Sequence, residues 1–268
     1  MEGQIGVVVP TLNSAKTLRL TLESLVSQIG VRVEVLVVDS ASTDGTLALC
    51  RDFGVQMISV PKGNMYRAVN AGLFKLRHEW VTYLNSDDIV RPDAYLRLIQ
   101  RGEKNVADLA YGDCDYIDGD NKWIGRRYSA PLTLISGLLK GRVMPFAQPS
   151  CVFRKALYEK LGGFDERFRF GADLDFVGRA YASGAVFCRV ARPVAAFRVH
   201  SSQLSIKHKE AAAAEHLLLR YPGLLRSRLP PAGVLWAWRL QNAVPLLQKV
   251  ARISWQGVVD ASRMLQKQ

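Results

Sequence analysis

Short apolar runs alternate with amphipathic stretches over the first hundred residues of the chain. The run IGVVV, at 5–9, is apolar at every position, which is typical of a strand buried on both faces of a sheet. Comparable runs rich in β-branched residues follow at 33–39, 55–60 and 80–85. Each run has the length and composition of a β-strand.

The stretches between these runs have the 3.6-residue period of helices. The first helix is expected directly after the segment PTLNS, at 10–14, and further helices are expected at about 44–53 and 65–76. Asn13 or Ser14 is placed to cap the first helix, and Asp44 to cap the second. The βαβαβαβ order predicts an α/β fold with a mostly parallel sheet and helices on both faces. The expected apolar face of the first helix comprises Ala15, Leu18, Leu22 and Leu25.

Polar side chains directly follow three of the four predicted strands. In such sheets ligands bind beyond the carboxyl ends of the strands, which all meet at one edge. Carboxylates there, beside helix N-termini that attract anions, suit a site where a divalent cation bridges protein oxygens and a diphosphate. The alternative is that Asp87 and Asp88 only cap the helix that begins near Pro92. The side chains concerned are Thr11, Asn13, Asp39, Ser42, Asp44, Asn85, Ser86, Asp87 and Asp88.

Five motifs occur between about residue 4 and residue 205. They are VVVPTLNSAKTLRLTLESL, EVLVVDSASTDGT, NMYRAVNAG, VTYLNSDD and GGFDERFRFGADLDFVGRA. In this order and at these separations they resemble glycosyltransferase family 2, the inverting nucleotide-sugar transferases of the GT-A fold. The resemblance implies a Rossmann-like GT-A domain at 1–205, with a nucleotide-sugar-binding half at 1–105 and an acceptor-binding half at 106–205. A basic amphipathic helical extension is expected at 206–268.

The resemblance assigns the nucleotide to the first strand ends and to the third helix. Asp39 matches the acid that accepts a hydrogen bond from the base, and a carboxylate can read a ring N–H such as that of uracil. The expected donor is therefore a UDP-sugar. Capping of the following turn is the alternative for Asp39, and a solvated helix face is the alternative for Arg67. The expected nucleotide contacts are Pro10, Thr11, Asn13, Asp39, Arg67, Asn70 and Ser86.

The tetrad NSDD matches the DxD position of the family. Asn85 stands in place of its first acid, and Asp87 holds the place of the metal-coordinating acid. FRVHSSQLS resembles the segment that closes over the diphosphate, so His200 is expected to ligate the metal or bind a phosphate, with Arg198 as a charge partner for phosphate. The expected cofactor is Mg²⁺ or Mn²⁺. The alternative for His200 is an ordinary surface or core residue.

The motif GADLDF matches the segment that carries the catalytic base of the family. That base takes the proton of the acceptor hydroxyl as its oxygen attacks the anomeric carbon. On a helix, Asp173 and Asp175 project roughly 200° apart, so only one of them faces the site. We expect Asp173 to be the base, Asp175 to be solvated or a cap, and Leu174, Val177 and Tyr181 to face the core. A favourable interaction with the helix dipole is the alternative for Asp173.

The segment MPFAQPSCVFRKALYEKLGGFD resembles the part of the family that shapes the acceptor pocket. Aromatic faces and amides suit hydroxyl-rich rings. Gln148 and Trp123 are therefore the expected acceptor contacts, together with Phe146. Core packing is the alternative for both aromatic residues. Upstream, the stretch LAYGDCDYIDGDNKWIGRRY predicts two strands joined by the turn DGDN.

Charge and cysteine content restrict the partners and the compartment. The formal net charge is +12 and the pI is about 9.7, which favours an anionic partner such as nucleic acid, a membrane surface or a phosphorylated substrate. The four cysteines include no CxxC pair and are expected to be reduced, buried thiols. A basic leader is lacking, and no uncharged apolar run reaches the roughly 18 residues of a membrane-spanning helix. We expect a cytoplasmic protein, with peripheral binding at the inner face of the cell membrane as an open alternative.

The tail carries most of the excess positive charge. Residues 206–268 contain ten Lys or Arg and three acids, which gives +7 of the +12. Apolar residues from 246 onward fall on one helical face, a pattern that lets a basic helix lie in an anionic membrane interface. The alternatives are packing on the catalytic domain or on another subunit of a homo-oligomer. The apolar face comprises Leu246, Val250, Ile253, Gly257, Ala261 and Met264, with Trp236, Trp238 and Trp255 nearby.

These patterns predict a metal-dependent inverting glycosyltransferase. It would move a sugar from a nucleotide donor to a hydroxyl of a glycan or lipid-linked glycan, and the resemblance places it in cell-surface polysaccharide biosynthesis. A nucleotidyltransferase is one alternative, but it typically has a Gly-rich loop after the first strand, and VPTLNSAKT has no glycine. A non-catalytic nucleic-acid-binding protein is the other. No nucleic-acid motif is present, so no nucleic-acid partner is expected.

Overall fold

The first half of the chain is a βα repeat. The computed structural model describes residues 3–200, 203, 208–219 and 232–265. Its first four strands pair in parallel, in the spatial order third, second, first, fourth. The elements are β1 (Gly3–Thr11), α1 (Leu18–Val26), β2 (Val31–Asp39), α2 (Thr46–Asp52), β3 (Gln56–Ser59), α3 (Met65–Lys75) and β4 (Trp80–Tyr83).

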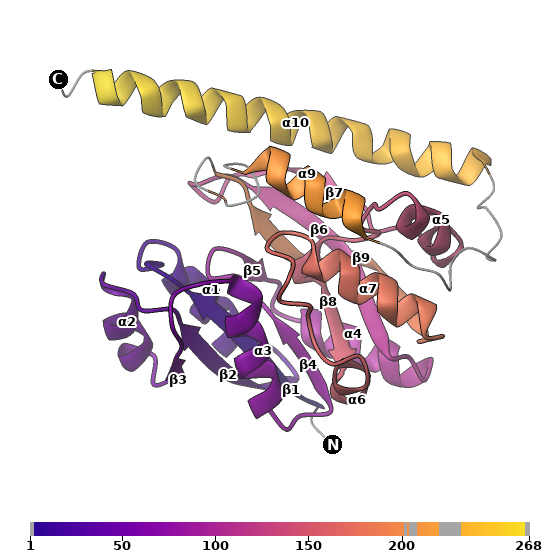
Figure 1. Cartoon of the computed structure of the whole chain (residues 1–268), viewed down its shortest axis with the longest axis horizontal. Helices are drawn as coiled ribbons and strands as arrows, with labels where there is room; N and C mark the ends of the chain where they lie inside the picture. Colours follow the sequence, from indigo (N-terminus) through magenta and orange to yellow (C-terminus); the bar gives the residue numbers. More distant parts are fainter. Residues whose placement is uncertain (1–2, 201–202, 204–207, 220–231, 266–268) are drawn as a thin grey trace.

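The second half extends the same sheet with mixed pairing. Its strands are β5 (Ile89–Val90), β6 (Leu109–Ile117), β7 (Trp123–Arg127), β8 (Cys151–Arg154) and β9 (Phe187–Arg198). The nine strands follow the order β3-β2-β1-β4-β8-β6-β9-β5, with β7 paired to β6 (Figure 1). The α/β fold with a mostly parallel sheet is confirmed, and β6 and β7 are the two strands predicted around the turn DGDN.

Helices cover both faces of the sheet. Along β1, Val8 packs in the cluster that contains α3, whereas Val7 and Val9 pack on the opposite face with α1. A Cβ on Gly72 of α3 would lie 2.6 Å from Val8 Cγ2, so the helix backbone lies directly on the sheet. The helices of the second half are α4 (Ala94–Lys104), α5 (Ile135–Lys140), α6 (Lys155–Lys160) and α7 (Ala172–Ala182), with short 3₁₀ turns η1 (Leu132–Leu134) and η2 (Gln148–Ser150).

The predicted start and cap of α1 need correction, whereas its buried face and the buried cysteines are as predicted. Helix α1 begins at Leu18, not near residue 14, and its N-cap Thr17 makes no side-chain cap hydrogen bond. Asn13 has a positive φ of 52°, which turns the chain before the helix, so neither Asn13 nor Ser14 is the cap. Leu18, Leu22 and Leu25 are nevertheless fully buried, as their spacing predicts. The four cysteines are free and buried, also as predicted.

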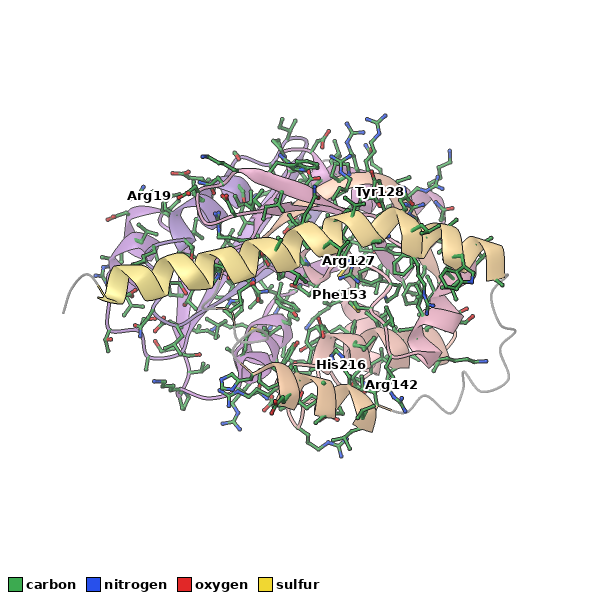
Figure 2. All side chains as sticks on the ribbon, turned by 90° about the horizontal axis from the view of Figure 1, so that it is seen from above. Arg19, Arg127, Tyr128, Arg142, Phe153 and His216 are labelled. Carbon is green, nitrogen blue, oxygen red and sulfur yellow. The ribbon has the colours of Figure 1, made fainter. Side chains whose placement is uncertain are left out.

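The described residues of the tail include the helices α9 (Lys209–Leu218) and α10 (Ala232–Leu265), and α10 lies across the molecule (Figure 2). One face of α10 packs on β7 and the segment after it. Trp238 Nε1 donates to the carbonyl of Tyr128 at 3.0 Å, and the Tyr128 N–H donates to Asn242 Oδ1 at 2.9 Å. Gly125 of β7 leaves room for Pro245, whose Cα would lie 3.3 Å from a Cβ on that glycine.

Packing on the catalytic domain thus holds for this face of α10. The opposite face exposes a stripe of apolar side chains: Trp236 is 61% exposed, although Trp238, two residues on, is 9% exposed. Of the face expected from residue 246 onward, Val250 is exposed, and the other side chains lie outside the described part of the structure, as does Trp255. None of the described helices is both long and apolar enough to span a bilayer.

Candidate active site

The ends of β1 and β2 are tied together by the Asp39 carboxylate. Thr11 Oγ1 donates to Asp39 Oδ1 at 3.0 Å, and Ser42 donates to the same carboxylate through its Oγ at 2.5 Å and through its N–H at 2.9 Å. Asp39 is 1% exposed. The turn-capping contact weighed for this residue is therefore present. It uses three of the roughly four lone-pair positions of the carboxylate.

Asn13 and its neighbours tie the loop after β1 to the loops after β2 and β4. Asn13 Oδ1 accepts the N–H of Thr43, and the Asn13 N–H donates to Ser42 Oγ, both at 2.8 Å. Ser86 Oγ lies 2.7 Å from Ser14 Oγ. Pro10 is buried at the end of β1, directly below these loops. The polar residues after the strands thus come together at one edge, as their positions predict.

Asp44 lies next to the N-cap of α2, which is Gly45 and not Asp44 as expected. Its carboxylate accepts the N–H of Thr46 at 3.0 Å, in the first turn of α2, and the N–H of Ala15 at 3.1 Å. Hydrogen bonds from Thr46, first through its hydroxyl, lower the pKa of Asp44. Asp44 therefore binds the first N–H group of α2 from the position before the N-cap, and it braces the loop that follows β1.

Asp87 and Asp88 have different environments. Asp87 Oδ2 lies 2.9 Å from His200 Nε2, and both side chains are partly exposed. Asp88 is fully buried and accepts the N–H of Arg198 at 2.9 Å, and burial raises its pKa. The alternative that these acids cap α4 is wrong, because the N-cap of α4 is Asp93. Asp87, not Asp88, is the acid that an ion at this edge could reach.

Arg198 does not face a phosphate site in the way the sequence suggested. It is 2% exposed, and its guanidinium donates to the carbonyls of Asp87 at 2.8 Å and of Asp118 at 3.1 Å. Its position at the end of β9 follows from an apolar strand that carries it into the core. Arg198 fixes the backbone of Asp87 and so holds the Asp87–His200 pair in place.

The Asp87–His200 pair fits one side of a divalent-cation shell. Across the described ranges, no three His, Cys, Asp or Glu side chains come together as a metal cluster. Mg²⁺ usually takes one or two protein ligands and completes its shell with phosphate oxygens and water. A carboxylate and an imidazole on adjoining strand ends match that arrangement.

Asp173 lies at the N-terminal end of α7 and lines a small cavity of about 10 Å³ with aromatic and apolar walls, which has room for about one water molecule. Tyr83, Gln148, Cys151 and Phe164 also line this pocket. Burial raises the pKa of Asp173, while hydrogen bonds from the Leu174 N–H and the Tyr66 hydroxyl, together with the charge of His216, act in the opposite direction. A carboxylate with a raised pKa in a pocket has the properties of a general base.

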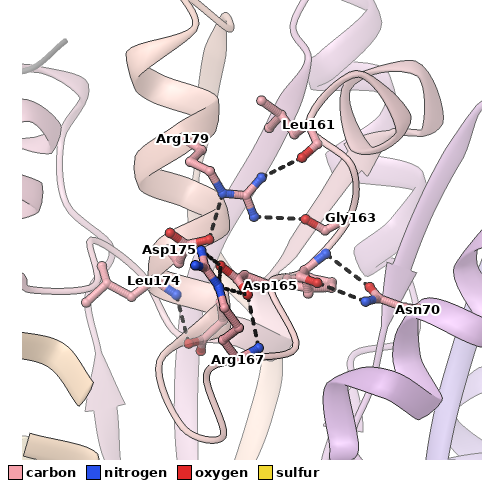
Figure 3. Close-up of polar contacts among 10 residues, drawn as sticks. Asn70, Leu161, Gly163, Asp165, Arg167, Leu174, Asp175 and Arg179 are labelled. Atoms are coloured by element: carbon pink, nitrogen blue, oxygen red, sulfur yellow. Dashed lines mark hydrogen bonds and ion pairs between the residues drawn. The ribbon is translucent and has the colours of Figure 1, made fainter. Parts of the chain in front are cut away.

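Asp175 is not the solvated residue that the sequence predicted. It is 8% exposed and accepts a hydrogen bond from Arg179 Nε at 2.6 Å. Arg179 also donates to the carbonyls of Leu161 and Gly163 at 2.7 and 2.8 Å (Figure 3). Asp175 therefore anchors the loop before α7, and the two acids point apart as a helix requires. The expected core stripe of Leu174, Val177 and Tyr181 is confirmed.

Gln148 and the two predicted aromatic contacts differ in their surroundings. Gln148 Nε2 donates to the carbonyl of Tyr83 at 2.9 Å, while its Oε1 is buried with no hydrogen-bond partner in the described residues. Phe146 is fully buried and stacks on Tyr111, so core packing explains it. Trp123 is largely exposed, and its Nε1 donates to Asp115. Core packing is therefore wrong for Trp123.

Arg67 and Asn70 of α3 contact the loop before α7. Arg67 Nε pairs with Glu166 at 3.2 Å on the surface. Asn70 Nδ2 donates to the Phe164 carbonyl and to Glu166, and its Oδ1 accepts from Tyr158 and from the Phe164 N–H. All four hydrogen-bonding positions of Asn70 are thus used within the protein. The assignment of Asn70 to the nucleotide stays a prediction, and the side chain has no hydrogen-bonding position left for a ligand in the described structure.

Sequence reasoning missed Tyr66 and Tyr83, whose hydroxyls are fully enclosed near Asp173. Burial raises the pKa of both phenols well above the usual value, with the nearby Asp173 carboxylate as a further cause. Tyr83 ends β4 two residues before the first residue of the NSDD tetrad, so its position at a strand end was the available signal. Tyr66 gave none, because an aromatic residue on a helix is read first as core.

Comparisons with known proteins agree with this geometry. The family model described as Glycosyl transferase family 2 matches residues 6–162. The succinoglycan biosynthesis protein ExoO of Rhizobium meliloti is 32% identical over 241 residues, covering 81% of this chain and 68% of that protein. A PGL/p-HBAD biosynthesis glycosyltransferase of Mycobacterium bovis is 29% identical over 200 residues, covering 71% of this chain and 75% of that protein.

Two solved structures have the same fold at low sequence identity. S. aureus TarS in complex with UDP superposes with a TM-score of 0.63 at 18% identity, covering 89% of this chain and 70% of that chain. The mannosyltransferase PcManGT from Pyrobaculum calidifontis, in complex with GDP-Man and Mn²⁺, has a TM-score of 0.61 at 20% identity, covering 98% and 78%. The fold and the strand-end site define a glycosyltransferase of the GT-A type. This chain belongs to glycosyltransferase family 2.

The buried Asp175–Arg179 pair gives a test of the loop before α7. We expect Asp175→Asn to lower the free energy of unfolding by about 1–3 kcal/mol, because a charge-assisted hydrogen bond in a buried setting is weakened. Urea denaturation measures the change. The exposed Asp120→Asn in the turn after β6 is the control and should change stability by no more than about 0.5 kcal/mol. Equal, small effects of both substitutions would mean that Asp175 is solvated after all.

Proposed function

We propose that the protein is a metal-dependent inverting glycosyltransferase that moves a sugar from UDP to a hydroxyl of a glycan or lipid-linked glycan, in cell-surface polysaccharide biosynthesis. The observation that carries the proposal is the pocket at the end of β4. It places the Asp173 carboxylate, with its raised pKa, in one pocket with the buried Gln148 amide. Membership of glycosyltransferase family 2 argues against the two alternatives, a nucleotidyltransferase and a nucleic-acid-binding protein.

Asp173 is the proposed base. Its carboxylate accepts the proton of the acceptor hydroxyl while that oxygen attacks the anomeric carbon, and the bond from this carbon to the nucleoside diphosphate breaks on the opposite side. Gln148 Oε1 is the proposed acceptor contact. This buried oxygen has no hydrogen-bond partner among the described residues, and leaving such an acceptor unsatisfied costs about 1–3 kcal/mol. A second hydroxyl of the sugar would satisfy it. Trp123 is proposed as a more distant acceptor contact through its exposed ring.

Asp39 supports uracil as the base of the donor. Its contacts with Thr11 and Ser42 leave about one acceptor position on the carboxylate. Uracil offers a single ring N–H, whereas guanine offers an N–H and an adjacent amino group, which together need two positions. Pro10, Asn13, Ser86 and Arg67 are proposed to enclose the rest of the nucleotide, and Asn70 to support the loop beside it. TarS was solved with UDP and PcManGT with GDP-Man, so related folds bind either base.

Asp87 and His200 are the proposed metal ligands. A bound Mg²⁺ or Mn²⁺ would neutralise negative charge on the departing diphosphate. Arg198 keeps the Asp87 backbone in place from below through its hydrogen bond to the Asp87 carbonyl. The neutral Asn85 leaves one acid fewer at this edge than the family pattern has, so the donor's own phosphates supply part of the binding site for the ion.

Nucleotide binding tests the donor and the metal together. We expect UDP with Mn²⁺ to raise the melting temperature by about 5 °C at saturation, because a ligand that binds only the folded protein stabilises it. Asp87→Ala should remove the metal-dependent part of this shift, since one of two proposed protein ligands is lost. The exposed Asp52→Ala in α2 is the control with the same charge change. A shift with GDP or dTDP in place of UDP would overturn the donor, and an unchanged shift in Asp87→Ala would overturn the metal ligand.

Asp173 is tested by rate and by pH. Asp173→Asn should lower kcat at least about 100-fold, measured as nucleoside diphosphate released from a nucleotide sugar whose base is the one that the binding experiment identifies. The base works deprotonated, and burial raises its pKa, so activity should fall with decreasing pH at values above those of an ordinary aspartate. The titratable groups around it are Tyr66, Tyr83, Cys151 and His216. Burial raises the pKa of the two phenols and of the thiol, so these three groups stay protonated in this range.

A control and a contrary outcome complete this test. Asp120→Asn should leave both kcat and the acid limb of the pH profile unchanged. Full turnover in Asp173→Asn would remove Asp173 from the chemistry.

We also propose that the exposed face of α10 rests on an anionic membrane surface. Its stripe of exposed apolar side chains points away from the face that packs on β7. The tail around it carries +7 of the net charge, which complements anionic headgroups. The Arg239 guanidinium lies 6.0 Å from the Trp236 ring, and such aromatic and basic side chains suit the interface. The stripe comprises Trp236, Leu240, Val244, Leu247 and Val250.

Vesicle sedimentation tests this surface. The double variant Leu240→Glu/Leu247→Glu should bind vesicles rich in phosphatidylglycerol at least about 10-fold more weakly than the unchanged protein, because two charges enter the apolar stripe. Val26→Glu/Ile29→Glu, at two exposed apolar residues of the donor half, changes the net charge equally and should bind as before. Absence of vesicle binding, with a dimer that the first variant dissociates, would show that a second copy covers the stripe.

A further inference from the structure

Helix α9 of the tail holds the chain directly before α7. Both oxygens of the Glu215 carboxylate accept the N–H of Arg169 at 2.9 Å, and Glu215 Oε2 also accepts the N–H groups of Phe170 at 2.7 Å and of Gly171 at 3.1 Å. Gly171 is the N-cap of α7. A single carboxylate thus satisfies three successive backbone donors where a helix begins, two residues before Asp173.

Other contacts fix α9 on the same segment. The His216 ring lies against Gly171, where a Cβ would be 3.2 Å from His216 Cδ2, and the His208 ring lies 5.7 Å from that of Phe170. At the end of the helix, Leu219 is buried in the main core. Its carbonyl accepts a hydrogen bond from Arg142 Nε at 3.3 Å. The helix is therefore held along its length, and Glu215 is presented to the loop in one position.

The geometry of Asp173 depends on this loop. The residue is the second of α7, and its Oδ1 accepts the N–H of Leu174 at 2.8 Å. Its carboxylate position is thus set by the backbone direction at the start of the helix. On the far side of the loop, Arg179 and Asn70 hold Gly163 and Phe164. Later in the same loop, directly before α7, the Glu215 carboxylate holds the backbone of residues 169–171.

We propose that Glu215 is a positioning residue for the catalytic base. This inference rests on the proposed role of Asp173. Glu215 does not line the pocket, and it acts through the backbone of residues 169–171. A displacement of about 1 Å in a reacting group can lower a rate about 100-fold, so the loss of these hydrogen bonds should be visible in turnover. The tail, outside the residues that match the family model, would then supply part of the catalytic machinery.

The test compares two glutamates of one helix. Glu215→Gln keeps the shape of the side chain but removes the negative charge and one of the two acceptor oxygens, whereas Glu210→Gln makes the same change at an exposed position of α9. We expect Glu215→Gln to lower kcat about 10-fold or more, with the Kd for the nucleoside diphosphate unchanged, because Glu215 makes no contact with the strand ends that would bind it. Glu210→Gln should leave both quantities unchanged.

A conservative variant keeps the test decisive. Glu215→Asp retains the charge on a shorter side chain and should give a kcat between those of the unchanged protein and Glu215→Gln. A kcat for Glu215→Gln within about twofold of the unchanged protein, while Asp173→Asn is inactive, would overturn the positioning role and leave the proposed function standing. A weaker Kd for the nucleoside diphosphate in Glu215→Gln, with kcat unchanged, would also overturn it. Full activity of Asp173→Asn would instead remove the proposed base itself.

Discussion

A sheet covered by helices on both faces leaves only the ends of its strands for polar chemistry. The faces of β1 are filled by Val7, Val8 and Val9, and the backbone of α3 lies against them at Gly72. Charged groups in those layers would lose hydration without a partner. Carboxylates lie instead at the edge of the sheet formed by the strand ends, which we call the rim. Asp39 ends β2, Asp87 follows β4, and Asp173 lies in the first turn of α7.

The rim is rigid because buried polar groups support it. Asp88 and Arg198 are both buried. The Asp88 carboxylate accepts the backbone N–H of Arg198, and the Arg198 guanidinium donates to the Asp87 carbonyl. Near Asp173, the Arg179 side chain donates to the Asp175 carboxylate and to the carbonyls of Leu161 and Gly163. In both cases one acid of a neighbouring pair is used for structure. The other acid is left at the surface of the site, which divides two chemically equal residues into different roles.

The sequence was sufficient for most of the fold, and it indicated a candidate site at one edge of the sheet. Periodicity identified the βα order, and the strand ends brought Asp39 and Asp87 to this edge. Asp173 was assigned only through the resemblance of GADLDF to the family's segment, and its role stays a proposal. It was not sufficient where a role depends on tertiary packing. Asp175 was expected to be solvated, but it is buried beside Arg179, whose guanidinium donates to the carbonyls of Leu161 and Gly163. Arg198 was expected to serve a phosphate, but it is buried and donates to the carbonyls of Asp87 and Asp118. The start of α1 was misplaced because the left-handed turn at Asn13 leaves no mark in the apolar pattern.

Two of the contacts described above join residues that are far apart in synthesis. His200 meets Asp87 across 113 residues of chain, and Glu215 meets Gly171 across 44. Domains tend to fold as units as they leave the ribosome, and long-range contacts form late. A nascent chain that ends before residue 200 can complete the first parallel strands but has neither of these contacts. With the roles proposed above for His200 and Glu215, such an unfinished chain would lack one metal ligand and the support of the catalytic base until the tail has left the ribosome.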